Sequence, residues 1–189
     1  MKISTKNIVM CAMFAALTCA VAPISIPLPG GVPITLQQVS VMLAGLLLGA
    51  KLGAVSELVY LLLGAFGLPV FAGLSGGLGR IAGPSGGFLM GYPVLAAICG
   101  LIYWRWGRFR TGAVKYAVMA AAMLLGNAAL YAIGLSWFMH VTGNTLEQAM
   151  VLCMLPFIPG DILKMIAVGA LVPQLEKALK AAGAEVFAL

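Results

Sequence analysis

The sequence predicts an all-α membrane protein with six transmembrane helices and both termini in the cytoplasm. The first reason is composition: of the 189 residues, 62% are hydrophobic and 8% are charged, and the mean hydropathy is +1.09. Soluble domains contain about 25% charged residues, so this chain has too few charges to cover a surface that faces water. The other two reasons are the lengths of its apolar segments and the placement of its basic residues.

The apolar segments have the length of membrane spans, because a helix needs roughly 20 apolar residues to cross the hydrocarbon core. Six segments approach this length: 7–24, 36–50, 53–68, 86–104, 115–138 and 151–173. The second and third are short, and we expect them to tilt little or to be partly re-entrant. The first resembles a signal peptide, but the five segments that follow favour a retained helix. We expect one domain, residues 1–189, without a soluble catalytic or ATP-hydrolysing part.

The basic residues indicate the orientation of the chain. With the N-terminus inside, nine of the eleven Lys and Arg residues fall on the inner side: Lys2, Lys6, Lys51, Arg105, Arg108, Arg110, Lys115, Lys177 and Lys180. Positive residues concentrate on the cytoplasmic side of membranes, so this distribution favours cytoplasmic termini. The run RWGRFR at 105–110 is then a loop near anionic lipid, and the net charge of +6 does not indicate a nucleic-acid partner.

Three loops are expected on the outer side, at 23–37, 67–87 and 140–148. They are more elaborate than the inner turns, which indicates that something is recognised from outside. Residues 77–82 match a dinucleotide-binding fingerprint, but no strand precedes them, so we do not interpret them as a nucleotide site. Glycine permits close backbone approach, and non-helical backbone at membrane depth must be buried in protein or line a cavity. This loop is therefore expected to cover a cavity.

Asp161 and Lys164 lie inside the last apolar segment, three residues apart and hence on one face of a helix. Ionisable groups within a membrane are costly and indicate a functional site by default. A carboxylate and an ammonium together offer acceptors and donors to a polar ligand, so we interpret the pair as part of a small-molecule site. A structural alternative is open, because Pro159 and Gly160 precede Asp161 and make it a candidate helix N-cap.

Four further polar residues are candidates for the same site. Gln37 lies where the first outer loop enters the second segment, Tyr92 lies in the fourth segment and Asn127 in the fifth. Each of these is also explained by an interhelical hydrogen bond. Arg80, in the glycine-rich loop, has a guanidinium suited to an anionic ligand group, or it extends to a lipid phosphate. Together with the charged pair, these residues are expected to converge on one outer pocket.

Nothing in the sequence indicates an enzyme, a metal site or a cofactor. The chain has one histidine, His140, with no Ser–His or Cys–His neighbourhood, no paired carboxylates and no HExxH motif. Its four cysteines lie within apolar segments and form no CxxC motif, so we interpret them as small apolar residues.

Small residues recur at helical spacing in the first segment, at Ala12, Ala16 and Ala20. Such a strip allows close helix packing, either within the fold or against another membrane protein. A second strip is expected at Gly45, Gly49 and Gly53.

Two stretches resemble the BioY family, the biotin-binding S components of energy-coupling-factor (ECF) transporters. They are LLLGAFGLPVFAGLSGGLGRIAGPSGGFLMGY (61–92) and PFIPGDILK (156–164), and the similarity extends over nearly the whole chain. The resemblance implies the S-component fold and a protein of the prokaryotic plasma membrane that captures biotin from outside. It implies that the biotin ring system meets Asp161 and Lys164. The carboxylate of biotin would lie toward Arg80, Tyr92 and Asn127.

The resemblance also implies partners. The alanine strip would dock on a transmembrane coupling subunit, and two partner ATPases would supply energy through that subunit. Biotin would be cargo rather than a cofactor, and release would follow rotation of the whole S component in the membrane. Two other hypotheses are a secondary transporter or facilitator that acts unaided, and a membrane adaptor that transports nothing.

Overall fold

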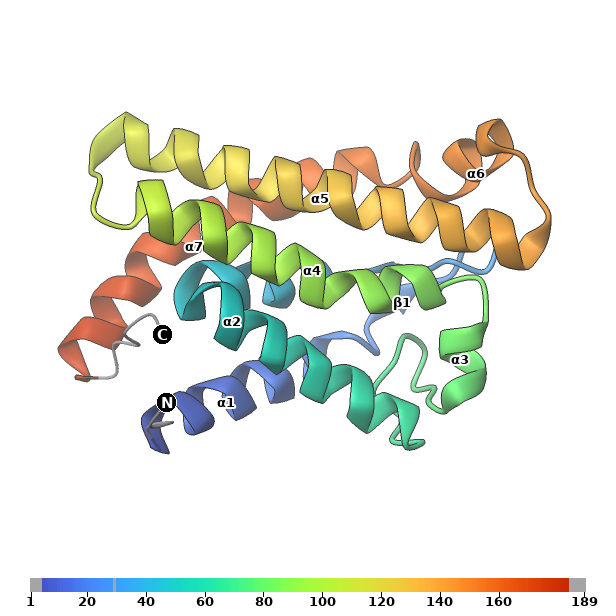
Figure 1. The fold of residues 1–189 in the computed structure, drawn as a ribbon, viewed down its shortest axis with the longest axis horizontal. Helices are drawn as coiled ribbons and strands as arrows, with labels where there is room; N and C mark the ends of the chain where they lie inside the picture. The colour runs from blue at the N-terminus through green and yellow to red at the C-terminus, as the bar shows by residue number, and fades with distance from the viewer. Residues whose placement is uncertain (1–4, 29, 184–189) are drawn as a thin grey trace.

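The computed structural model describes residues 5–28 and 30–183, and this part of the chain is mostly helical (Figure 1). Lys2, one of the predicted inner charges, lies outside the described residues. The elements in order are α1 (Thr5–Val21), β1 (Ser25–Ile26), β2 (Ile34–Thr35), α2 (Gln37–Ala65), α3 (Leu78–Ala82), α4 (Gly86–Ile102), the π-helical turn η1 (Tyr103–Gly107), α5 (Gly112–Thr142), α6 (Leu146–Cys153) and α7 (Ile158–Ala181).

Within the described residues, four helices are long and apolar enough to cross a membrane: Gln37–Ala65, Gly86–Gly107, Gly112–Thr142 and Ile158–Ala181. The chain is therefore a multi-pass membrane protein by the length and composition of its helices. The apolar helix α1 has 17 residues and is shorter than these spans.

Helix α2 consists of two helical halves and reverses direction between them at Gly49, where φ is 83° and ψ is 175°. A Cβ added at Gly53 would lie 2.9 Å from the Cα of Gly45. Eight residues of a straight helix span about 12 Å, so the two halves of α2 fold back on each other. The turn falls slightly earlier than the predicted break between 50 and 53. It also shows that the predicted strip of Gly45, Gly49 and Gly53 is wrong, because these glycines do not share a helix face.

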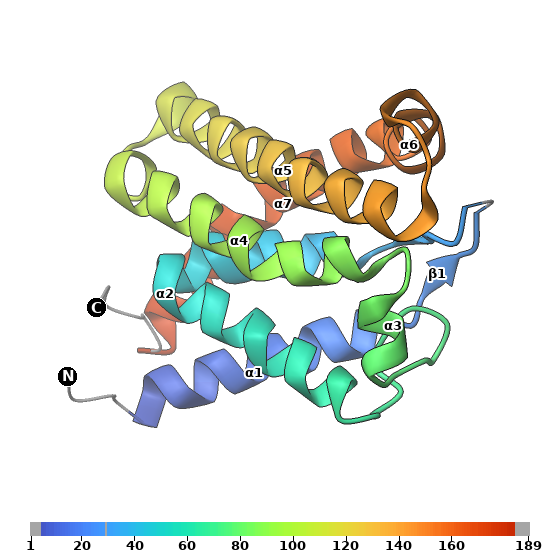
Figure 2. The same cartoon turned by 45° about the vertical axis from the view of Figure 1, so that its right-hand side comes forward.

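The bundle is built around α4, which packs between α2 and α5, while α1 packs on α2 (Figure 1). The two turns expected on the inner side, which the structure places at Gly49 and at 108–111, lie at one end of the bundle together with the start of α1 and the end of α7 (Figure 1). At this end Lys6 Nζ donates to the Gly183 carbonyl at 2.6 Å. The first two predicted outer loops and α6 lie at the opposite end (Figure 2).

The outer-loop end contains secondary structure that the sequence did not predict. β1 and β2 pair antiparallel, with Ser25 opposite Thr35, and the glycine-rich loop contains the short helix α3. The last predicted span, 151–173, is also wrong at its start. Its first residues belong to α6, the chain then turns, and the spanning helix begins at Ile158.

Close contact between α2 and α4 depends on glycine. A Cβ at Gly45 would lie 2.3 Å from the Ala96 carbonyl oxygen, and a Cβ at Gly100 would lie 2.3 Å from the Ala50 nitrogen. Both obstacles are backbone atoms, which cannot rotate away. Small residues at such crossings let helix backbones approach in a membrane, where association depends on packing.

We predict that Gly45→Ala lowers the free energy of unfolding by about 1–3 kcal/mol, the usual cost of overpacking. The measurement is thermal unfolding of the detergent-purified protein. Gly169→Ala is the matched control, because a Cβ there has no atom within 4 Å. Equal melting temperatures for the two variants would contradict this account of the α2–α4 contact.

Candidate functional site

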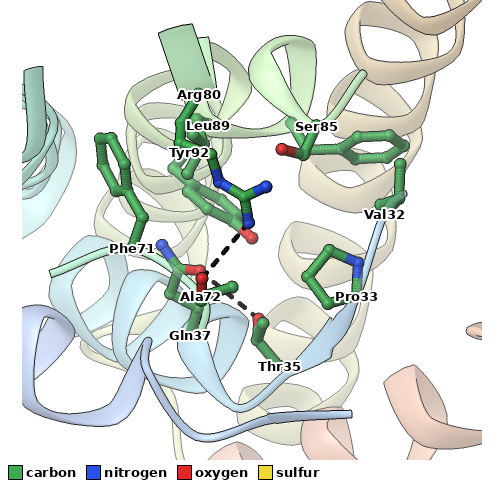
Figure 3. Close-up of a pocket in the computed structure, with 11 residues that line it drawn as sticks. Val32, Pro33, Thr35, Gln37, Phe71, Ala72, Arg80, Ser85, Leu89 and Tyr92 are labelled. Carbon is green, nitrogen blue, oxygen red and sulfur yellow. Dashed lines mark hydrogen bonds between the residues drawn. The ribbon is translucent and has the colours of Figure 1, made fainter. Parts of the chain in front are cut away.

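Two adjacent hollows lie beneath the β1–β2 loop and the glycine-rich loop, at the end of the bundle where α3 lies. The Arg80 hollow is lined by residues that include Arg80, Gln37 and Phe71, and has a volume of about 30 Å³ (Figure 3). The Lys164 hollow is lined by residues that include Lys164 and Tyr131, and has a volume of about 40 Å³. Five residues line both hollows: Val32, Pro33, Thr35, Phe88 and Tyr92.

Arg80 points from α3 into its hollow, above the ring of Tyr92 (Figure 3). One guanidinium nitrogen donates to the Ala72 carbonyl at 3.3 Å. Within the described residues no carboxylate pairs with Arg80. Arg80 is half-buried, which supports a side chain directed at the hollow rather than at lipid. A guanidinium without a carboxylate partner in a hollow suits an anionic ligand group.

Gln37, at the first turn of α2, closes the floor of the Arg80 hollow. Its amide nitrogen donates to the hydroxyl of Tyr60, and Thr35 donates to its amide oxygen at 3.5 Å. Tyr60 in turn packs edge-on against Phe71, with ring centroids 5.6 Å apart. Gln37 therefore links the start of α2 to the glycine-rich loop.

The Lys164 hollow is backed by a connected polar network. Lys164 Nζ donates to Asp161 Oδ1 at 3.1 Å and to Gln38 Oε1 at 3.0 Å. Gln38 donates to Asn127 Oδ1, and the Tyr131 hydroxyl donates to Asp161 Oδ2. Three helices, α2, α5 and α7, thus contribute to one hydrogen-bonded chain.

The charges of this network are balanced and almost fully enclosed, since Asp161 is 5% exposed and Lys164 is 8% exposed. A buried pair of this kind is stable only when further hydrogen bonds satisfy its remaining atoms, which Gln38 and Tyr131 do here. Lys164 lines the hollow, whereas Asp161 lies behind it and orients it.

The candidate N-cap role of Asp161 is wrong. Helix α7 begins at Ile158 and its N-cap is Phe157, so Asp161 lies within the first turn. Its amide donates to the Phe157 carbonyl at 2.8 Å, which is a regular helical bond. The carboxylate is thereby left for Tyr131 and Lys164.

The predicted site residues therefore separate into two groups. Arg80, Gln37, Tyr92 and Lys164 line the hollows. Asp161 and Asn127 form a second layer that holds the lining residues in place. The sequence interpretation missed Tyr131, whose position four residues after Asn127, on the same helix face, is the signal that could have found it.

Helix α1 presents the alanine strip to the outside of the bundle, where Ala12, Ala16 and Ala20 are all exposed. The opposite face is held by buried polar contacts. Thr18 Oγ1 lies 3.1 Å from Glu57 Oε1 and 3.0 Å from Ser40 Oγ, both of which belong to α2. The strip is therefore a row of small side chains that this fold leaves uncovered.

Solved structures with the same architecture are S components. A crystal structure of the S-component for biotin from an ECF-type ABC transporter matches with a TM-score of 0.81 and 30% identity, covering 91% of each chain. A second S component of a bacterial ECF transporter has a TM-score of 0.61 at 18% identity, covering 93% of this chain and 96% of that one. The latter shows the fold alone.

Sequence comparisons agree with this architecture. A probable biotin transporter BioY of Pyrococcus horikoshii is 44% identical over 159 residues, which are 84% of this chain and 89% of its own. The biotin transporter BioY of Rhodobacter capsulatus is 41% identical over 173 residues, covering 87% and 90%. The model of the BioY family matches residues 1–181. The chain belongs to the BioY family.

Proposed function

We propose that this protein captures biotin from outside the cell as the S component of an ECF-type ABC transporter. The observation that carries the proposal is a pair of adjoining hollows, with Arg80 in one and Lys164, held by its ion pair with Asp161, in the other. They share Tyr92 and Phe88 as a partly aromatic wall. The relative that is 41% identical to this chain is the biotin transporter BioY of Rhodobacter capsulatus.

The chemistry of biotin matches this arrangement. Its cyclic urea offers N–H donors and a carbonyl acceptor at one end, and a carboxylate ends its alkyl chain at the other. The Lys164 ammonium and the Gln38 amide supply a donor and an acceptor for the urea, while the Arg80 guanidinium forms charge-assisted hydrogen bonds with the carboxylate. The apolar middle of biotin lies against Phe88 and Tyr92. No cofactor takes part in this binding.

The loops at this end act as the lid. The hollows hold 30 and 40 Å³, whereas pockets for small organic ligands hold about 300–1,000 Å³. Val32 and Pro33, between β1 and β2, line both hollows, so displacement of this loop joins them into one pocket. Phe71 and Ala72 of the glycine-rich loop move with it and admit biotin beside Arg80.

The chain is one domain with six membrane spans. These spans are α1, the two halves of α2, α4 with η1, α5 and α7. Both termini lie in the cytoplasm of a prokaryotic cell, and the protein resides in the plasma membrane. The end carrying the exposed residues Arg105, Arg110 and Lys177 then faces inward, in accordance with the positive-inside rule. The hollows open outward.

Transport is driven by partners. Ala12, Ala16 and Ala20 form the contact with a transmembrane coupling subunit, because small residues permit close approach of a second helix. Two ATPase subunits act through that subunit. The rigid attachment of α1 to α2 through Thr18 and Glu57 allows the bundle to rotate as one body and release biotin inside.

We predict that Asp161→Ala weakens biotin binding roughly 30-fold or more, because truncating one partner of a buried charge pair costs 2–5 kcal/mol. The measurement is titration calorimetry of the detergent-purified protein. Ile162→Ala, at an exposed position of the same helix turn, is the matched control and is expected to bind normally. An Asp161→Ala protein that is monodisperse and binds biotin with unchanged affinity would refute the role of the pair.

Arg80→Gln tests the other hollow. We predict that the wild type prefers biotin to its neutral carboxamide, and that the variant loses most of this preference, because only the carboxylate gains from a guanidinium. Competition binding of the two ligands gives the ratio directly. Arg108→Gln, at the other end of the bundle, keeps the preference. A variant that discriminates as well as the wild type would place the carboxylate elsewhere.

Ala16→Trp tests the docking strip. We predict normal biotin binding and at least a tenfold loss of uptake in cells that co-express the coupling subunit and the ATPases, because the indole separates the two helix surfaces. Leu125→Trp, at an exposed position of α5, is the control and is expected to leave uptake unchanged. Biotin uptake by the purified chain alone in liposomes would instead support a facilitator that acts unaided.

A further inference from the structure

A groove of about 530 Å³ runs between α5 and α7, away from the two hollows. Met119 and Met123 of α5 form one wall, and Ile162 and Ile166 of α7 form the other. Gly169 lies along its length, and a Cβ there would meet no atom within 4 Å, so α7 leaves this space open. The volume is comparable to that of pockets that hold small organic ligands.

The groove suits a long apolar chain. Apart from the hydroxyl of Tyr116 at one end, the side chains that line it are aliphatic or thioether groups. The groove lies between two membrane-spanning helices, so its apolar walls face the hydrocarbon core rather than water. Methionine walls adapt to irregular apolar shapes, which suits an acyl chain better than a rigid polar molecule.

One end of the groove leads to basic residues. On α7, Lys177 follows Ala170 by seven residues and therefore continues the groove-lining face of the helix. On the other side, Arg110 precedes α5 by two residues, below Tyr116. Lys177 and Arg110 are both exposed, and neither has a carboxylate partner within residues 5–28 and 30–183.

Within residues 5–28 and 30–183, the acidic residue near this end is Glu176, and its charge is neutralised. Glu176 accepts from Lys115 at 2.5 Å and from the Tyr103 hydroxyl at 2.7 Å. This contact ties α5, α7 and η1 together at the mouth of the groove. The charge that remains available there is therefore positive, contributed by Lys177 and Arg110.

We propose that the α5–α7 groove is a binding site for an anionic phospholipid. One acyl chain lies along Met119, Met123, Ile166 and Gly169, and the phosphate meets Lys177 and Arg110. Basic clusters between transmembrane helices at the cytoplasmic side recognise acidic lipid head groups in this manner. A second protein helix in the groove would gain from the apolar walls but would not need the two cations.

The test is exchange of the purified protein with mixed micelles that contain equal amounts of phosphatidylglycerol and phosphatidylcholine with identical acyl chains. Native mass spectrometry then counts the lipids retained. We expect the wild type to retain phosphatidylglycerol preferentially, and Lys177→Gln to lose roughly fivefold of that preference, the effect of one cation near an anionic lipid surface. Lys51→Gln, which removes a charge at the same end of the bundle outside this groove, is expected to behave as the wild type.

The apolar part of the site is tested separately. Ala170→Phe fills the groove and is expected to lower retention of both lipids, whereas Ala167→Phe, the same change at an exposed position of α7 outside the groove, is expected to leave it unchanged. Equal retention of the two lipids by the wild type would overturn the proposal. A lipid-independent dimer that Ala170→Phe abolishes would also overturn it, by showing that a second copy occupies the groove. None of these measurements depends on biotin.

Discussion

A buried ion pair is costly unless further hydrogen bonds satisfy its remaining atoms, and the Lys164–Asp161 pair imposes this condition on the surrounding helices. Lys164 needs Gln38 from α2, and Asp161 needs Tyr131 from α5. The register of three helices is therefore coupled to one ion pair. A binding site made from the same atoms has a rigid back wall, so a ligand meets donors and acceptors that are already oriented.

The glycine contacts make this coupling possible. Gly45 and Gly100 let α2 and α4 approach until backbone meets backbone, and the turn at Gly49 returns the chain so that both halves of α2 pack in the bundle. Trp104 closes the turn by donating its indole N–H to the Leu46 carbonyl at 2.9 Å, a group that the end of a helix would otherwise leave unpaired. This packing brings Gln37, on α2, and Tyr92, on α4, to the same hollow.

Three surfaces of the bundle then have different chemistry. The loop end has polar and charged groups enclosed beneath the β1–β2 loop and the glycine-rich loop, which suits a small ligand with a charged tail. The outer face of α1 includes the alanine strip, whose small side chains suit a helix partner. The α5–α7 groove is apolar with a basic mouth, which suits lipid. The polar contacts of Thr18 and Glu57 behind α1, and of Glu176 below the groove, stabilise these surfaces from within.

The sequence by itself determined that the chain lies in a membrane, that its fold is helical and which polar residues are candidates for the site. Composition alone required a membrane, the spacing of Asp161 and Lys164 put them on one helix face, and the alanine spacing in the first segment defined a strip that the structure leaves exposed. These are local properties, set by helix periodicity and by the cost of burying charge.

Only the tertiary structure decided which of those residues line the hollows and which hold the lining residues in place. Helix ends depend on which backbone groups find partners, so Asp161 is inside the first turn of α7 and not its cap, and residues 151–153 belong to α6. Gly45, Gly49 and Gly53 do not share a face, because a turn at one glycine reverses the helix. The contact of Tyr131 with Asp161, the second-layer role of Asn127 and the open groove along Gly169 all depend on how α5 packs beside α7. Contacts between segments this far apart in the chain follow from packing in three dimensions, which no local pattern specifies.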